Sequence, residues 1–113
     1  MTPDVCIVIL TWNQRETTLA CLARLRAMSY PRARIVLVDN GSTDGTAAAV
    51  RAAFPEVDLL ALPGNLGCAG GRNVGIAYFL RRTDAPYMML LDNDIEAQSD
   101  FVERTLDVFA RHP

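Results

Sequence analysis

Four short apolar runs alternate along the chain with four longer amphipathic segments, and this alternation limits the fold more than any other feature. The runs contain no regular alternation of polar with apolar residues, and they occupy residues 5–10, 35–38, 57–62 and 87–91. Continuous apolar strands of this kind are typical of parallel sheets that helices cover on both faces. The sequence therefore predicts an α/β fold of order βαβαβαβα, a three-layer αβα doubly wound sheet that is mainly parallel.

The amphipathic segments carry signals for the ends of helices. Three of them begin with residues that commonly cap helices, and the remaining one begins near Gly70. The predicted capping residues are Asn13 with Glu16 for the first helix, Ser42 or Thr43 for the second, and Asp100 with Glu103 for the fourth.

Length and composition exclude several classes of protein. The chain has 113 residues, which is enough for one compact domain and too few for two. Its net charge is −2 and it has no basic stretch, so a nucleic-acid partner is not expected. All eleven basic residues are arginine, which excludes phosphate-loop ATPases, Schiff-base enzymes and receiver domains because each needs a lysine. The single histidine, His112, is the penultimate residue, which argues against a catalytic triad or a histidine-rich zinc site.

The cysteines and the apolar runs suggest a compartment. Cys6, Cys21 and Cys68 show no CxxC spacing, so we expect reduced thiols in the cytoplasm. The first residues lack the basic head of a signal peptide, and no run approaches the roughly 20 apolar residues that span a bilayer. The expectation is a cytoplasmic protein, and peripheral membrane attachment of a longer parent stays open.

Polar, acidic and glycine-rich residues follow each predicted strand. These segments are residues 11–13, 39–45, 63–73 and 92–94. In doubly wound sheets, ligands bind outside the carboxyl ends of the strands. The sequence therefore predicts one ligand-binding edge, where a nucleotide would lie.

Asp92 and Asp94 follow the last apolar run directly. Two carboxylates at i and i+2 suit Mg²⁺ or Mn²⁺, which protein carboxylates and substrate phosphates hold together. A turn made by Asp-Asn-Asp explains the same residues equally well.

Asp39 ends the second run and is suited to accept hydrogen bonds from a base or a ribose. The alternative is that residues 39–42 form a turn before the next helix, and taken alone this alternative is favoured. Thr11 is suited to contact a nucleotide through its backbone or hydroxyl, whereas Trp12 either stacks on a base or packs in the core.

Arg72 follows four glycines at the predicted start of a helix. Glycines allow a ligand to approach the backbone, and a helix N-terminus favours an anion. Arg72 therefore either neutralises a diphosphate or pairs with an acidic neighbour. The GxGxxG fingerprint of nicotinamide dinucleotide domains is absent, which argues against an oxidoreductase of that kind.

The sequence resembles glycosyltransferase family 2, whose members adopt the Rossmann-like GT-A fold that binds nucleotide sugars. The stretches that carry the resemblance are VCIVILTWNQ, IVLVDNGSTDGT, NLGCAGGRNVGI and MMLLDNDIE. They stand in the family's order and cover most of residues 5–96. The third and fourth stretches look most like the rhamnosyltransferase-like branch.

The resemblance implies a metal-dependent, inverting transfer of sugar from a UDP-, dTDP- or GDP-sugar to a glycan or lipid-linked acceptor. Thr11 and Asp39 would line the base and ribose, and Arg72 would face the donor nucleotide. Asp92 and Asp94 would form the DxD motif, in which Asp94 holds Mg²⁺ or Mn²⁺ while Asp92 lies nearer the ribose.

The resemblance also implies that the general base lies downstream of Pro113. We therefore expect residues 1–113 to form the donor-binding half, truncated after the DxD motif, with the acceptor-binding half absent. A missing half would leave a sheet edge uncovered, which predicts self-association. The alternative is a catalytically silent nucleotide-binding or interaction module of the same fold.

Overall fold

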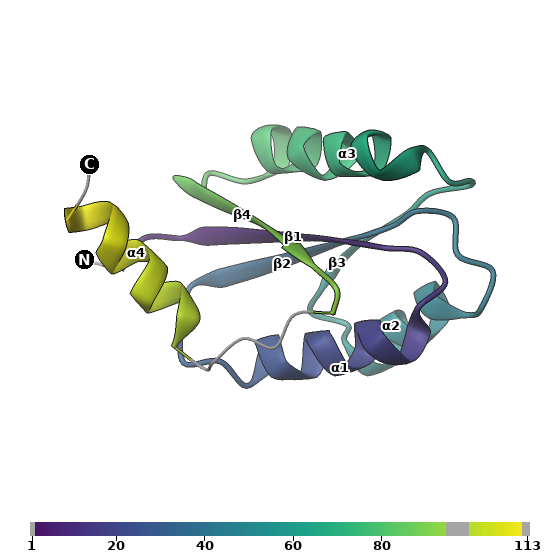
Figure 1. Cartoon of the computed structure of the whole chain (residues 1–113), viewed down its shortest axis with the longest axis horizontal. Coiled ribbons are helices and arrows are strands. Elements are labelled where there is room, and N and C mark those ends of the chain that lie inside the picture. The colour runs from purple at the N-terminus through teal and green to yellow at the C-terminus, as the bar shows by residue number, and fades with distance from the viewer. Residues whose placement is uncertain (1, 95–99, 112–113) are drawn as a thin grey trace.

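The computed structural model describes residues 2–94 and 100–111, and within these ranges four strands alternate with four helices (Figure 1). The elements in chain order are β1 (Val5–Thr11), α1 (Arg15–Arg26), β2 (Ala33–Asp39), α2 (Thr46–Ala53), β3 (Asp58–Ala61), α3 (Gly67–Arg82), β4 (Tyr87–Asp92) and α4 (Phe101–Arg111). Each predicted strand is present, with ends that differ by up to two residues from the predicted ones. His112, Pro113 and the last two residues of the stretch MMLLDNDIE lie outside the described residues.

The four strands form one parallel sheet in the order β3-β2-β1-β4. In the register of this sheet, Thr11 of β1 lies opposite Asp39 of β2, and Leu10 lies opposite Asp92 of β4. The carboxyl ends of the strands therefore meet at one edge, as the sequence predicts. The predicted α/β fold with a parallel sheet is confirmed.

Helices cover both faces of the sheet, so the molecule has three layers. The helix α3 lies on one face, and α1 and α2 lie on the other (Figure 1). Side chains of β1 alternate between the two cores: Ile7 packs with α1 and α2, whereas Val8 packs on the α3 side. Val102 of α4 is fully buried in the core on the α1 side.

The strand β4 differs from the prediction that every apolar run is buried on both faces. The prediction is correct for β1, where Ile7 and Ile9 have no exposed surface. It is wrong for β4, where Leu90 is 46% exposed and Tyr87 is 39% exposed. The reason is position, because β4 is the last strand of the described sheet and α3 packs mainly against β1 and β2.

Two predicted helix caps are wrong. The helix α1 begins at Arg15 with Gln14 at its N-cap position, and Asn13 lies before it with φ of +50°. The helix α2 begins at Thr46 with Gly45 at its N-cap position, so neither Ser42 nor Thr43 caps it. In both cases the predicted capping groups bond to a neighbouring loop, and the helix beside them begins farther along.

The other two helices agree better with the sequence. The helix α3 begins at Gly67, three residues before the predicted start at Gly70. The helix α4 follows Asp100 directly, and the backbone N–H of Arg104 donates to the Asp100 carbonyl at 3.1 Å. The Glu103 carboxylate accepts a hydrogen bond from the Ser29 hydroxyl at 2.6 Å, which ties α4 to the segment after α1.

The three cysteines are free, with Cys6 and Cys21 buried and Cys68 exposed. Burial raises the pKa of the Cys6 and Cys21 thiols, which keeps both protonated at neutral pH. Within the described ranges, every helix is too short or too polar to cross a membrane.

Candidate functional site

The carboxyl edge of the sheet brings together Arg72 of α3 and Asp92 of β4. Arg72 Nη2 lies 3.3 Å from Asp92 Oδ1, and the two side chains are 45% and 69% exposed. Both line a cavity of about 270 Å³ whose other walls are Val8, Leu10, Leu90 and Leu91. An exposed ion pair of this kind typically stabilises a fold by under about 1 kcal/mol. Both charges therefore remain accessible to a ligand at little cost in stability.

Asp94 follows β4 in a turn and is exposed. Asp92 and Asp94 are therefore both directed to solvent, with Asn93 between them buried to 8% exposure. No group of three or more His, Cys, Asp or Glu side chains in residues 2–94 and 100–111 is placed to hold a metal ion. The assignment of a cation to the Asp92 and Asp94 carboxylates stays a prediction.

Asp39 is buried at 2% exposure, and its Oδ1 accepts a hydrogen bond from the Ser42 backbone N–H at 3.0 Å. This bond forms the turn that the sequence offered as the alternative to ligand binding. That Asp39 also accepts hydrogen bonds from a base or ribose stays a prediction.

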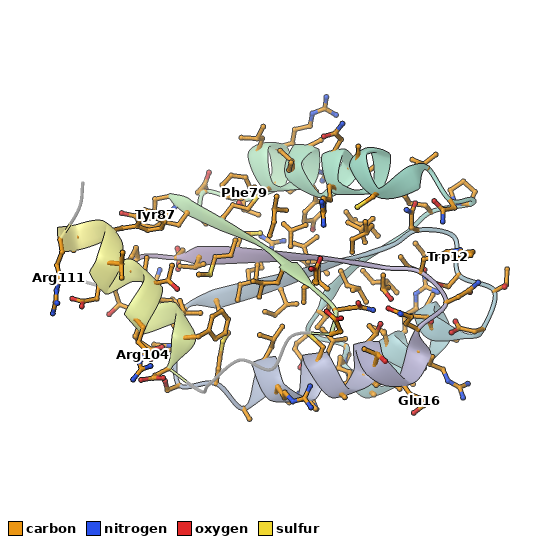
Figure 2. All side chains as sticks on the ribbon, viewed as in Figure 1. Trp12, Glu16, Phe79, Tyr87, Arg104 and Arg111 are labelled. Carbon is orange, nitrogen blue, oxygen red and sulfur yellow. The ribbon has the colours of Figure 1, made fainter. Side chains whose placement is uncertain are left out.

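Thr11 is likewise buried, at 2% exposure. Its hydroxyl oxygen lies 2.7 Å from the Thr18 hydroxyl oxygen, and its carbonyl accepts a hydrogen bond from the Asn40 backbone N–H at 2.9 Å. The nucleotide contact assigned to Thr11 stays a prediction. Trp12, in contrast, is 51% exposed at this end of β1 (Figure 2), so it does not pack in the core.

Three asparagines that follow strands connect the loops of this edge, and sequence reasoning missed all three connections. The backbone N–H of Asn13 donates to the Ser42 hydroxyl at 2.8 Å, and Asn13 Oδ1 accepts from the Thr43 backbone N–H at 2.7 Å. These bonds join the loop after β1 to the loop after β2. The signal in the sequence is the recurrence of asparagine within two residues of three strand ends.

Asn40 joins the loop after β2 to the glycine-rich loop after β3. Its Nδ2 donates to the Gly67 carbonyl at 3.0 Å, and its Oδ1 accepts from the Leu66 backbone N–H at 2.9 Å. The same two loops touch at Gly41, which has φ of +83° and whose Cβ, if present, would lie 2.6 Å from the Gly64 carbonyl carbon. Glycine is therefore required at position 41 by both conformation and space.

Asn93 joins the loop after β4 to β1 and α1. Its Nδ2 lies 2.8 Å from Gln14 Oε1, 3.1 Å from Thr11 Oγ1 and 3.2 Å from Thr18 Oγ1. The three asparagine side chains thus connect neighbouring loops in the order of the strands in the sheet. Asn93 joins the loops after β4 and β1, Asn13 those after β1 and β2, and Asn40 those after β2 and β3.

One carboxylate at this edge has a shifted pKa. The Thr46 hydroxyl, followed by the backbone N–H groups of Arg15 and Thr46, holds the pKa of Asp44 below its ordinary value. Asp44 therefore stays ionised at neutral pH and fixes the start of α1 to the start of α2.

A parallel α/β sheet that gathers acidic and glycine-rich loops at its carboxyl edge is the architecture of a nucleotide-binding domain. The chain belongs to glycosyl transferase family 2, because the model of that family matches residues 6–113. The resemblance to this family is therefore confirmed, whereas the rhamnosyltransferase-like branch stays a prediction.

Individual relatives agree with this assignment. The chain is 28% identical over 107 residues to the glycosyltransferase AglE of Haloferax volcanii, covering 90% of this chain and 34% of the relative. It is 32% identical over 106 residues to the succinoglycan biosynthesis protein ExoO of Rhizobium meliloti, covering 93% of this chain and 29% of the relative.

Solved structures show the same fold. The mannosyltransferase PcManGT of Pyrobaculum calidifontis superposes with a TM-score of 0.81 at 24% identity, over 97% of this chain and 33% of that protein. Residues 1–349 of S. aureus TarS superpose with a TM-score of 0.77 at 22% identity, over 96% of this chain and 33% of that fragment. The GT-A fold is confirmed, and the chain spans about a third of the length of the relatives that it matches.

Proposed function

We propose that this chain is the donor-binding part of a glycosyltransferase that transfers a sugar from a nucleotide-diphospho-sugar. The observation that carries the proposal is that Asp92, paired with Arg72, and the exposed Asp94 both follow β4 at the edge where nucleotides bind in such sheets. PcManGT was solved in complex with GDP-Man and Mn²⁺, and TarS with UDP-GlcNAc, which supports a sugar nucleotide as ligand.

The residues of this edge suit a divalent cation. Carboxylate oxygens are the protein ligands that Mg²⁺ and Mn²⁺ prefer, and the remaining positions are usually taken by water and phosphate oxygens. In the proposal Asp94 holds the cation and Asp92 lies nearer the ribose. A bound cation supplies positive charge that stabilises the departing diphosphate.

The other site residues have separate roles in the proposal. The Arg72 guanidinium adds fixed positive charge next to the diphosphate, and Asp39 accepts hydrogen bonds from the base or ribose. We assign no residue of this chain as the general base. We expect the transfer to be inverting and the acceptor to be a glycan or a lipid-linked molecule. The general base and the acceptor-binding residues are expected in the part of the relatives that this chain does not match. A cytoplasmic location is part of the proposal and rests on the sequence alone, whose three cysteines show no CxxC spacing.

The variant Asp94→Asn tests the metal site. We expect the wild-type chain to be stabilised against heat by UDP, GDP or dTDP in the presence of Mn²⁺, because a ligand of the native state raises its stability. Asp94→Asn should keep the circular dichroism spectrum and lose the Mn²⁺-dependent part of that stabilisation. The matched control is Asp107→Asn, which removes an exposed carboxylate from α4 and should retain it.

If Asp94→Asn still binds the nucleotide in an Mn²⁺-dependent way, Asp94 does not hold the metal. The Asp-Asn-Asp sequence is then explained as a turn alone. Binding alone also fits a catalytically silent module of the same fold. Sugar transfer by a longer protein that contains this chain, lost in Asp94→Asn, separates the enzyme from the silent module.

A further inference from the structure

We propose that Asn93 is a positioning residue that fixes the turn carrying the Asp92 and Asp94 carboxylates, with the buried Thr18 as its anchor. This inference rests on the proposed function of the two carboxylates. It assigns a role to the middle residue of the Asp-Asn-Asp motif and to a helix residue that lies behind the site.

The side-chain amide nitrogen of Asn93 lies within hydrogen-bond distance of three oxygen atoms. The acceptors are Gln14 Oε1 at 2.8 Å, Thr11 Oγ1 at 3.1 Å and Thr18 Oγ1 at 3.2 Å, and they lie 75 to 82 residues earlier in the chain. An amide nitrogen carries two hydrogens, so the three acceptors share them. The loop after β4 is therefore fastened to β1 and α1 by a single buried group.

This fastening fixes the position of the neighbouring side chains. Asn93 is 8% exposed, whereas the Asp92 side chain is 69% exposed and Asp94 is exposed. Residues 93 and 94 form a turn after β4, so the inward-held Asn93 amide fixes the turn that carries the exposed Asp92 and Asp94 carboxylates. Without the Asn93 bonds the turn would lose its anchor to β1 and α1, and the two carboxylates would no longer be held in fixed positions.

The chemistry of the contact favours an amide over a carboxylate at position 93. Thr11 and Thr18 share one hydrogen bond at 2.7 Å, which uses one hydroxyl hydrogen and leaves oxygen lone pairs that need a donor. The Asn93 amide nitrogen supplies that donor, and an ionised carboxylate has none. An aspartate here would also place a third negative charge between Asp92 and Asp94, where like charges oppose one another.

Thr18 allows a test that leaves the acidic loop untouched. It lies on α1 with no exposed surface, and its hydroxyl contacts both Asn93 and Thr11. Thr18→Val keeps the branched shape and removes the hydroxyl, whereas Thr18→Ser keeps the hydroxyl and removes a methyl group. The pair separates loss of the hydrogen bond from loss of packing.

The experiment measures Mn²⁺ affinity of the full 113-residue chain by calorimetry, with a saturating nucleoside diphosphate chosen from UDP, GDP and dTDP. We expect Asn93→Ala and Thr18→Val to weaken Mn²⁺ binding by about tenfold or more, as changes behind metal ligands commonly do. Thr18→Ser should restore most of the affinity. Binding of the nucleotide without Mn²⁺ should change little in any of these variants.

Two controls separate positioning from general loss of stability. Val50→Ala removes packing from a fully buried position on α2, outside the contacts of Asn93, and should lower the melting temperature while retaining Mn²⁺ affinity. Amide hydrogen exchange without metal should be faster at residues 90–94 in Asn93→Ala and Thr18→Val than in Val50→Ala.

The outcomes distinguish this inference from the proposed function. If the wild-type chain binds Mn²⁺ but Asn93→Ala and Thr18→Val bind it equally well, the positioning role is wrong and the proposed function stands. If Val50→Ala loses as much affinity as they do, general destabilisation explains the effect and the positioning role is again wrong. If the wild-type chain binds no Mn²⁺ with any of the three nucleotides, the proposed function fails and the positioning role fails with it.

Discussion

The strands β1 and β4 are neighbours in one sheet, and both are continuous apolar runs, yet their environments differ. Every residue of β1 except Leu10 is buried, whereas no residue of β4 is. The strand β1 has a partner on each side and helices on both faces, while β4 pairs with β1 alone in the described chain. The comparison teaches that apolar composition identifies a strand but that its neighbours decide how much of it is buried.

The two faces of β4 also differ from each other. On the α1 face, Met89 and Leu91 are partly buried and pack on the core that contains Val102 of α4. The ring of Tyr87 stacks on Phe109 of α4 with centroids 6.1 Å apart, so α4 covers the start of this strand. On the other face, Leu90 lines the open cavity beneath Arg72 and Asp92. The exposure of Leu90 thus arises on the face of β4 that α3 leaves uncovered.

The largest expected effect comes from removing a buried side chain of β1. Ile9 has no exposed surface, so Ile9→Ala should lower the free energy of unfolding by about 2–5 kcal/mol through lost burial and the cavity left behind. Leu90→Ala, on β4 at 46% exposure, should cost less than about 1 kcal/mol. Urea unfolding of both variants measures the difference. Equal losses would contradict the contrast between the strands.

A smaller effect is expected where α3 approaches β1. A Cβ at Gly75 would lie 2.4 Å from Val8 Cγ1 and 3.1 Å from Val38 Cγ2, so Gly75→Ala forces the helix and the sheet apart. Overpacking costs about 1–3 kcal/mol, which exceeds the gain of about 1 kcal/mol from better helix propensity.

The control for this prediction is Gly64→Ala, because a Cβ there would meet no atom within 4 Å. Its unfolding free energy should stay within about 0.5 kcal/mol of the wild type. If Gly75→Ala were as stable as Gly64→Ala, the prediction would be wrong, because the space between α3 and β1 would then accommodate a methyl group.

The elements of the fold were predictable because their signals are local. Runs such as residues 5–10 contain β-branched and other apolar residues in sequence, which identify a strand without knowledge of its partners. The order of strands and helices then places every strand-to-helix loop at one edge. Arg72, Asp92 and Asp94 were identified as candidates by this step alone, and the structure pairs the first two.

The errors concern interactions between distant parts of the chain. Asn13 has the local pattern of a helix cap, but its partners Ser42 and Thr43 lie about 30 residues away and are brought close by the pairing of β1 with β2. Asn93 was overlooked for the same reason, since its three partners precede it by 75 to 82 residues. The exposure of β4 likewise depends on the strand order, which the apolar pattern of residues 87–91 does not contain.

The smallest expected change in stability comes from Leu90→Lys. This variant should, however, clearly change the self-association of the chain. Leu90 is half exposed on the last strand of the described sheet, so the substitution should change the free energy of unfolding by no more than about 0.5 kcal/mol. An exposed apolar edge strand favours pairing with a second copy, and a charged lysine there opposes it. Sedimentation velocity over a range of concentrations should therefore show self-association of the wild-type chain that Leu90→Lys reduces.

The control is Leu80→Lys, which changes an exposed leucine on α3 away from the edge and should associate like the wild type. If both lysine variants reduce association equally, general surface hydrophobicity is responsible and the edge of β4 has no special part in it.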